Sequence, residues 1–261
     1  MRIELEDTEK KDAGASEDNL MEPAAREATA FKDLSGKKKA EYIWDYYKWW
    51  IIGGIAAIVL LVTFIRDYRE NSKPVYLYAE LLNTYLGYDR SASIYDDFVK
   101  EAGIDLTKEN LTIGTETTLS DENFDSTMIA YQQRLIANYA AQTIDVVIGP
   151  KAILEGPANC DCYADLGEIL PQDLIDELKD RDYEFYYFDP SKDQIEDYDE
   201  TVPPYFAGIY LDNCSYLNNI GEHGAYPVAE SEDERVIFTI AANSLRTDHA
   251  VEFLRFLIHN H

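Results

Sequence analysis

Hydrophobic and polar positions divide the chain into one uncharged block and a later series of short alternating runs. The block "WWIIGGIAAIVLLVTFI" covers residues 49–65 between Lys48 and Arg66. Seventeen helical residues measure about 26 Å, which is short for a hydrocarbon core of about 30 Å. The two flanking basic side chains extend the span, and the run "YYKWW" forms an aromatic belt at the headgroups. The pattern predicts a transmembrane helix over 49–65, with a buried core helix as the alternative.

Basic residues flank this block unequally. Close to its ends, five precede it (Lys32, Lys37, Lys38, Lys39 and Lys48) and three follow it (Arg66, Arg69 and Lys73). This bias predicts a cytoplasmic N-terminus, and residues 1–30 have no apolar region typical of a signal peptide, so the block is expected to act as an uncleaved signal anchor. The predicted partner of this part of the chain is the lipid bilayer.

The remaining boundaries follow from this topology. We expect a disordered cytoplasmic tail over 1–36, because its polar composition lacks a sustained apolar period. A basic and aromatic juxtamembrane segment over 37–48 leads into the span, and a polar stalk over 66–74 follows it. Residues 75–261 are then an extracellular domain of a single-pass cell-membrane protein.

Strand-like and helix-like periods alternate after residue 74. Strands are predicted at 75–82, 110–119, 144–149, 205–211 and 235–242, and helices at 91–103, 124–141, 171–180 and 247–260. Gly103 is expected to end the first of these helices and Thr247 to cap the last. The continuous apolar run "IDVVIG" is typical of a strand covered on both faces in a parallel sheet. This alternation predicts an α/β domain.

The net charge limits the classes of ligand that the domain can bind. The formal net charge is −27, of which residues 1–66 contribute −2 and residues 67–261 contribute −25. A nucleic-acid-binding protein normally presents a basic face to the phosphates, so this balance excludes nucleic acid as a partner. Anionic ligands are repelled unless a local pocket overrides the field.

Residues suited to chemistry are sparse. The chain has four histidines and no Gly-x-Ser-x-Gly, phosphate-loop or His-Glu-x-x-His motif, so we expect no enzyme, no cofactor and no metal. The acidic run from Asp189 to Glu200 lacks the spacing of a calcium loop and is interpreted as a solvated loop. Cys160, Cys162 and Cys214 lie outside the predicted membrane, where disulfides form; their pairing is left open.

Tyrosines gather around the strand predicted at 205–211. They are Tyr183, Tyr186, Tyr187, Tyr198 and Tyr205. Such rings either stack on sugars and line a peptide groove, or pack a small core with wet hydroxyls, and we favour the packing role.

Three segments resemble extracytoplasmic solute-binding proteins of the type 2 periplasmic-binding fold. They are "DVVIGPKAILEGPANCDCYADLGEIL", "PPYFAGIYLDN" and "FTIAANSLRTDHAVEFLRFLI", in the order found in that family. The resemblance covers roughly Val75 to His259. It implies a periplasmic-binding-like sheet with flanking helices and a ligand between two lobes. Only about 30 residues separate the second segment from the last helix, so we expect a reduced second lobe.

A ligand site is predicted at the carboxyl ends of the strands, where open α/β sheets bind ligands. The residues that follow these ends are Asn83, Thr84, Tyr85, Gly149, Pro150, Lys151, Asn243 and Ser244, and the family topology adds Tyr205. Lys151 offers a local positive charge. The alternative is that these are ordinary turn residues.

Two functions fit these features. The first is a membrane-anchored, non-catalytic protein resembling solute-binding proteins, which recognises a small molecule or peptide. The second is a cell-envelope interaction module that has lost the ligand site and binds another membrane protein. An envelope enzyme is the weakest reading, because no nucleophile and base can be named.

Overall fold

The computed structural model describes residues 36–87, 93–119, 126–155, 162–189 and 203–260. Two compact units make up the chain, Met1–Arg69 and Glu70–His261. The predicted tail, apart from residue 36, lies outside the described residues. So do Cys160, Tyr198 and all of the acidic run after Asp189.

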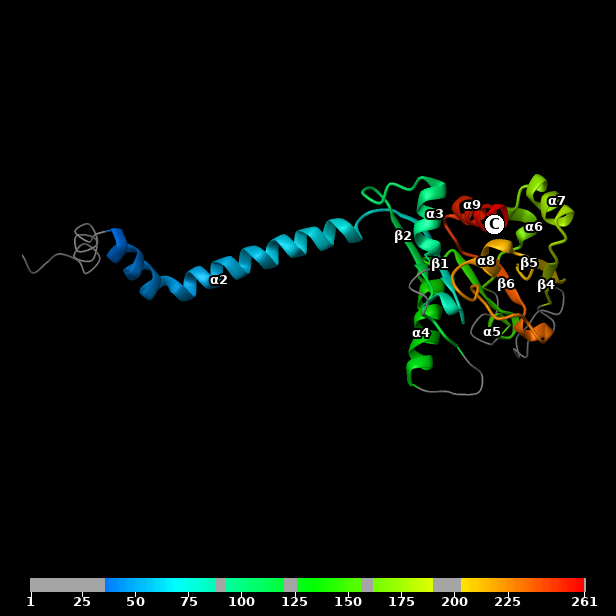
Figure 1. Cartoon of the computed structure of the whole chain (residues 1–261), viewed down its shortest axis with the longest axis horizontal. Coiled ribbons are helices and arrows are strands. Elements are labelled where there is room, and N and C mark those ends of the chain that lie inside the picture. Colours follow the sequence, from blue (N-terminus) through cyan, green and yellow to red (C-terminus); the bar gives the residue numbers. More distant parts are fainter. Residues whose placement is uncertain (1–35, 88–92, 120–125, 156–161, 190–202, 261) are drawn as a thin grey trace, which may run out of the picture. The chain divides into compact units, whose positions relative to one another are not determined.

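A single long helix, α2, runs from Gly36 to Asn71 (Figure 1). It contains the predicted span at 49–65, and its segment Tyr47–Asn71 is the one helix of the described residues long and apolar enough to cross a membrane. The hydroxyl of Thr63 donates to the carbonyl of Val59 at 3.0 Å, so this polar group is satisfied within the helix. An N-proximal apolar helix of this kind fits a single-pass anchor or a signal sequence.

Six strands form one mixed sheet in the order β2-β1-β3-β6-β5-β4. The parallel part consists of β1 (Val75–Leu81), β2 (Asn110–Gly114) and β3 (Val146–Pro150). The antiparallel part consists of β4 (Phe185–Phe188), β5 (Tyr205–Tyr210) and β6 (Val236–Ile240). The predicted α/β class is confirmed. The prediction that "IDVVIG" lies in a parallel sheet is right only on the β1 side, because β3 pairs antiparallel with β6 on the other.

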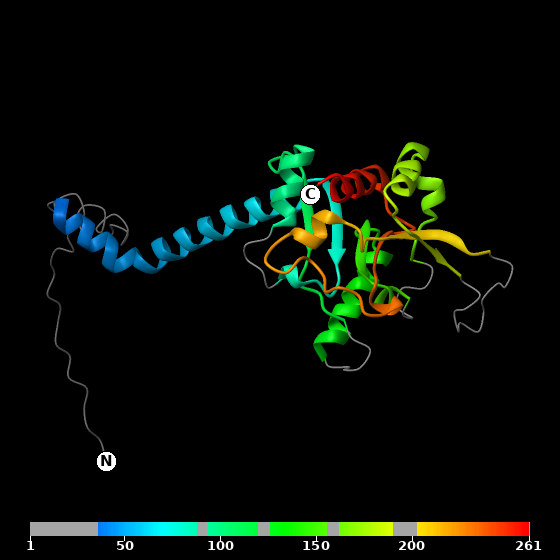
Figure 2. The same ribbon diagram turned by 45° about the vertical axis from the view of Figure 1, so that its right-hand side comes forward.

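Helices cover both faces of this sheet, and α9 and α4 lie on opposite sides of the strands (Figures 1 and 2). One face carries α3 (Ile94–Ala102), α6 (Leu166–Ile169), α7 (Gln172–Asp180), α8 (Ser215–Asn219) and α9 (Thr247–His259). The other carries α4 (Ser126–Ala140) and α5 (Lys151–Leu154). Two short 3₁₀ helices are η2 (Tyr85–Gly87) and η5 (Glu232–Glu234).

Each face has its own hydrophobic core. On the α9 face, the rings of Phe98 and Phe253 lie 4.9 Å apart, edge to face, and both side chains are fully buried. On the α4 face, Met128, Leu135 and Tyr139 are buried at helical spacings of seven and four residues. Alternate residues of a strand point to opposite faces, so the buried β3 strand contributes to both cores.

Helix ends follow local chemistry. Ser93 caps α3 by accepting from the backbone N–H of Asp96, and Gly103 ends the helix in the left-handed conformation that glycine adopts without strain. The prediction for the last helix needs correction, because Arg246 occupies the N-cap position and Thr247 is the first helical residue. The hydroxyl of Ser244 accepts from the backbone N–H of Arg246 instead.

All six described strands belong to this one sheet, within the unit Glu70–His261. The expected reduced second lobe has no sheet of its own among the described residues, because β5 and β6 both join the sheet that contains β3. The described part of the domain therefore holds no cleft between two sheets.

Candidate functional site

Six of the nine predicted ligand residues lie at one edge of the sheet. Leu81 pairs with Ile148 in parallel register, so the residues after β1 and those at the end of β3 leave the sheet together. This group comprises Asn83, Thr84, Tyr85, Gly149, Pro150 and Lys151.

The other three predicted residues lie at the opposite edge. β6 runs antiparallel to β3, so Asn243 and Ser244 follow the end of β6 beside the start of β3, where Ser244 donates to Asp145 at 2.6 Å. Tyr205 begins β5 at this same edge. The expectation that all nine residues gather around one site is wrong, because it assumed that β6 runs in the direction of β1 and β3.

Half of the first group, the three residues after β1, forms hydrogen bonds that hold turns. Asn83 adopts a positive φ of 57° and exchanges two hydrogen bonds with the backbone of Leu119. The carbonyl of Ala225 accepts from the Thr84 hydroxyl at 2.6 Å and from the Tyr85 backbone at 2.9 Å. These contacts fix a segment of the chain that leads into a surface groove.

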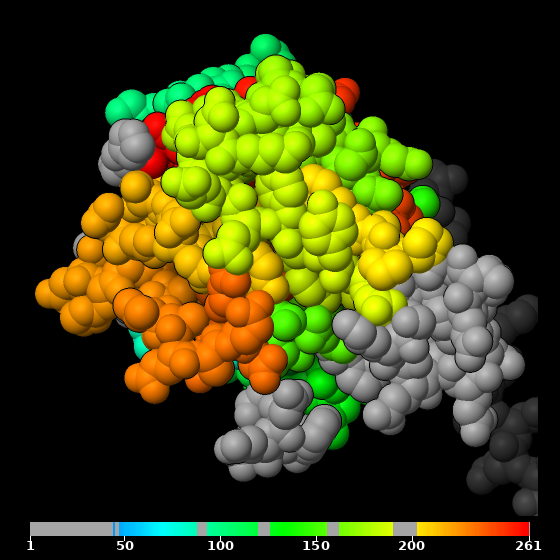
Figure 3. All heavy atoms as spheres, turned by 90° about the vertical axis from the view of Figure 1, so that its right-hand side faces the viewer, coloured from blue at the N-terminus to red at the C-terminus, as the bar shows by residue number. Residues whose placement is uncertain are grey.

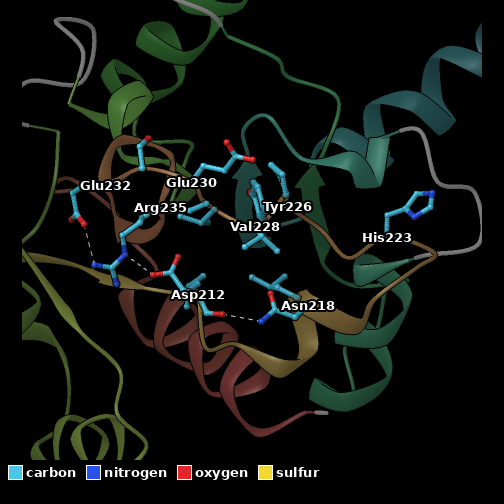
Figure 4. Close-up of a pocket in the computed structure, with 14 residues that line it drawn as sticks. Asp212, Asn218, His223, Tyr226, Val228, Glu230, Glu232 and Arg235 are labelled. Atoms are coloured by element: carbon cyan, nitrogen blue, oxygen red, sulfur yellow. Dashed lines mark hydrogen bonds and ion pairs between the residues drawn. The ribbon is translucent and has the colours of Figure 1, made fainter.

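This groove, which we call the β6 groove, is a cavity of about 640 Å³ beside the start of β6 (Figure 4). Its walls come from the end of β5, from α8 and from the segment 223–232. None of the nine predicted residues lines it. The lining residues are Leu211, Asp212, Leu217, Asn218, His223, Tyr226, Pro227, Val228, Ala229, Glu230, Ser231, Glu232, Arg235 and Val236.

Arg235 is held by carboxylates at one end of the groove. Its Nε donates to Asp212 at 2.6 Å, and one terminal nitrogen donates to Glu184 at 3.1 Å and to Glu232 at 3.3 Å. The guanidinium carbon also lies 3.8 Å from the ring centroid of Tyr210, in the range of a cation–π contact. The charge of this cation is already neutralised by the protein, so it is a poor anchor for an anionic ligand.

The groove is acidic beyond these ion pairs. Asp212, Glu230 and Glu232 face the single Arg235, which leaves a net charge of −2. A hydrogen bond from the Tyr210 hydroxyl, followed by Arg235, lowers the pKa of the Glu232 carboxyl, so it is ionised at neutral pH. Lys151 lies outside the lining, with its Nζ 3.8 Å from Glu232, and therefore offsets this charge only in part.

Apolar side chains share the lining with these charges. Leu211 and Leu217 are buried beneath the groove, whereas 91% of Val228 is exposed. In Figure 4, Val228 and Tyr226 stand between the acidic end and His223. Figure 3 shows that the orange part of the chain around residues 226–236 borders the yellow-green residues of β4 and α7 on one face. A ligand here would meet both carboxylates and an exposed aliphatic surface.

None of the described tyrosines of the predicted cluster lines the groove. Tyr183 and Tyr186 are buried, and the Tyr186 hydroxyl donates to Glu155 at 2.8 Å. Tyr187 is 57% exposed on β4 and Tyr205 is half-buried. For Tyr183 and Tyr186 the packing role fits; the tyrosines of the groove region are Tyr210 and Tyr226.

Three side chains of the types that catalysis most often uses, Cys214, His249 and His259, make hydrogen bonds within the protein. Burial raises the pKa of the Cys214 thiol to about 11, and this free thiol donates to the carbonyl of Leu257 at 3.2 Å. His249 lies with Nδ1 2.6 Å from the carbonyl of Tyr76, and His259 contacts Glu177 at 2.8 Å. No group of three or more His, Cys, Asp or Glu side chains among the described residues is placed to hold a metal ion.

Sequence reasoning missed the β6 groove because its walls are loops and short helices. The signal that could have found it is the run "YPVAESEDER", residues 226–235, where an isolated valine precedes four acidic residues and an arginine.

No protein-family model, curated protein or solved structure matches this chain. The resemblance to solute-binding proteins therefore identifies no family, and the domain stands as an α/β fold with a mixed six-stranded sheet.

Proposed function

We propose that this chain is a single-pass membrane protein whose folded domain is an interaction module outside the cell membrane. In this proposal the domain binds a segment of another cell-envelope protein in the β6 groove and catalyses no reaction. The observation that carries the proposal is the groove itself, a mixed acidic and apolar hollow on a domain that has one described sheet.

The geometry of the groove favours a partner protein over an enclosed solute. Small-molecule sites usually bury most of their ligand. Here Val228 stands 91% exposed at the lining, and the residues expected to close around a solute are divided between opposite sheet edges. The groove would cover its ligand on one side only. This suits a segment of a larger partner protein, whose other side faces the rest of that partner.

Recognition of a small molecule or free peptide is the second candidate. The observation that favours it is the volume of about 640 Å³, which lies within the range of roughly 300–1,000 Å³ found for ligand pockets. The two candidates differ in the mass of the molecule that contacts Val228 in the cell, which is a protein in the first and a small molecule or free peptide in the second.

A photo-crosslinking amino acid at position 228 of the full-length chain tests the proposal. Irradiation of intact cells should give an adduct larger by the mass of a partner protein. The matched control is position 245, where Leu245 is 71% exposed after β6, at the opposite sheet edge. Equal adducts at both positions, or none at 228, would contradict the proposal, and an adduct without a shift in size would favour the small-ligand candidate.

A further inference from the structure

We infer that the segment received by the β6 groove combines a lysine or arginine side chain with neighbouring apolar side chains. This inference rests on the proposed function and adds the chemistry of the partner. Three properties of the groove carry it: its neutralised cation, its remaining carboxylates and its uncovered aliphatic surface.

The only arginine in the lining is already neutralised by carboxylates of the protein itself. Its Nε and one terminal nitrogen contact three carboxylates, and its other side stacks on Tyr210. An anionic segment that approached Arg235 would face Asp212, Glu184 and Glu232, the three carboxylates that already neutralise it. The groove therefore discriminates against acidic partners.

The carboxylates have capacity left for a cation. Glu230 is exposed in the lining, and its side chain makes none of the described ion pairs. One Asp212 oxygen contacts Arg235, which leaves the second oxygen open to a further donor. A basic side chain would meet Asp212 or Glu230 without breaking the pairs that hold Arg235.

The apolar part of the groove sets the second requirement. Val228 is exposed next to Pro227, and Tyr226 and Leu217 lie in the same lining. Binding of an aliphatic side chain would remove this surface from water, which a small polycation does not achieve. The partner is therefore a peptide segment rather than a free polyamine.

The field of the whole domain acts in the same direction. Residues 67–261 carry a net charge of −25, which attracts a basic partner and repels an acidic one. This long-range effect belongs to the domain as a whole, so a test of the groove has to separate local contact from general attraction.

The test uses the full-length chain in nanodiscs of phosphatidylcholine and a fluorescent seven-residue peptide that alternates leucine with lysine or arginine. Fluorescence anisotropy should detect binding that weakens as salt rises. Analogues with glutamate in place of the basic residues, or serine in place of leucine, should bind at least tenfold more weakly, and spermine should not displace the peptide.

Matched variants locate the binding. Glu230→Gln should weaken binding of the peptide by roughly twofold to fivefold, the range of one exposed ion pair. Glu168→Gln removes an exposed charge on α6 and should leave the affinity for the peptide unchanged. Val228→Ser should weaken binding and Leu245→Ser should not.

Equal losses in both glutamate variants would show general attraction to the acidic domain and overturn the inference. Tight binding of the glutamate analogue, or displacement by spermine, would also overturn it. If a protein adduct forms at position 228 while none of these peptides binds, this inference is wrong but the proposed function still stands. If no protein adduct forms at position 228, the proposed function itself is wrong.

Discussion

Replacing Asp145 with alanine should lower the free energy of unfolding by about 3–5 kcal/mol, the cost of removing one partner from a buried ion pair. Asp145 is fully buried and accepts from the Tyr78 backbone at 2.8 Å, from the Ser244 hydroxyl at 2.6 Å and from Arg246 Nε at 2.8 Å. One carboxylate thus joins β1, the start of β3 and the turn before α9. Its loss leaves the guanidinium, only 18% exposed, without its carboxylate.

Urea unfolding of the detergent-solubilised chain, followed by far-ultraviolet circular dichroism, measures this effect. The matched control is Asp173→Ala, which removes an exposed carboxylate that also pairs with an arginine, Arg255, at 2.9 Å. The control should unfold close to the wild-type midpoint. An Asp145→Ala protein that unfolds at the control's midpoint would show that the buried pair does not hold these elements together.

Replacing Ile58 and Val59 with arginine should remove most of the protein from the membrane. Both residues lie near the middle of the uncharged block in α2. Insertion of an arginine at the centre of a membrane helix costs about 3 kcal/mol, so the pair costs roughly 6 kcal/mol in addition to the lost aliphatic contribution. Carbonate extraction of isolated membranes should release the variant and retain the wild type.

The control places the same two arginines ahead of the block, at Trp44 and Tyr47. There the side chains reach the headgroups, and they strengthen the basic bias of the N-terminal flank. This variant should stay in the membrane pellet. Equal retention of both variants would mean that α2 is not the membrane anchor.

The longer helices and most strands could be predicted because their signals are local. The apolar period within 124–141 predicted a helix, and α4 forms there with Met128, Leu135 and Tyr139 buried. The uncharged block became part of α2. β4 was missed because "FYYF" is only four residues long and its aromatic residues were read as a tyrosine cluster.

Strand direction is the feature that the sequence pattern does not contain. A strand buried on both faces reads as a continuous apolar run whether its neighbours are parallel or antiparallel, as Val236–Ile240 shows. The direction of β6 decides whether Asn243 and Ser244 meet Asn83 or lie at the other edge. The residues after β1 and at the end of β3 lie at the same edge, as predicted, because β1 and β3 are parallel. Asn243 and Ser244 lie at the other edge because β6 runs in the opposite direction.

The β6 groove depends on contacts between segments far apart in sequence. Its segment 223–232 is positioned by the bonds from Thr84 and Tyr85 to Ala225, and Arg235 is positioned by Glu184 and Asp212. Neither set follows a helical or strand period. The sequence itself contains only the acidic run before Arg235. The role of this run depends on the segments that fold against it.

The proposal that one helix displays the folded domain outside the cell membrane is tested most directly by protease access to intact cells. A chain with an N-terminal tag and a C-terminal tag should lose the C-terminal tag and the domain after Arg66, while the N-terminal tag stays protected until the membrane is permeabilised. Loss of the N-terminal tag from intact cells, with the domain retained, would contradict the account.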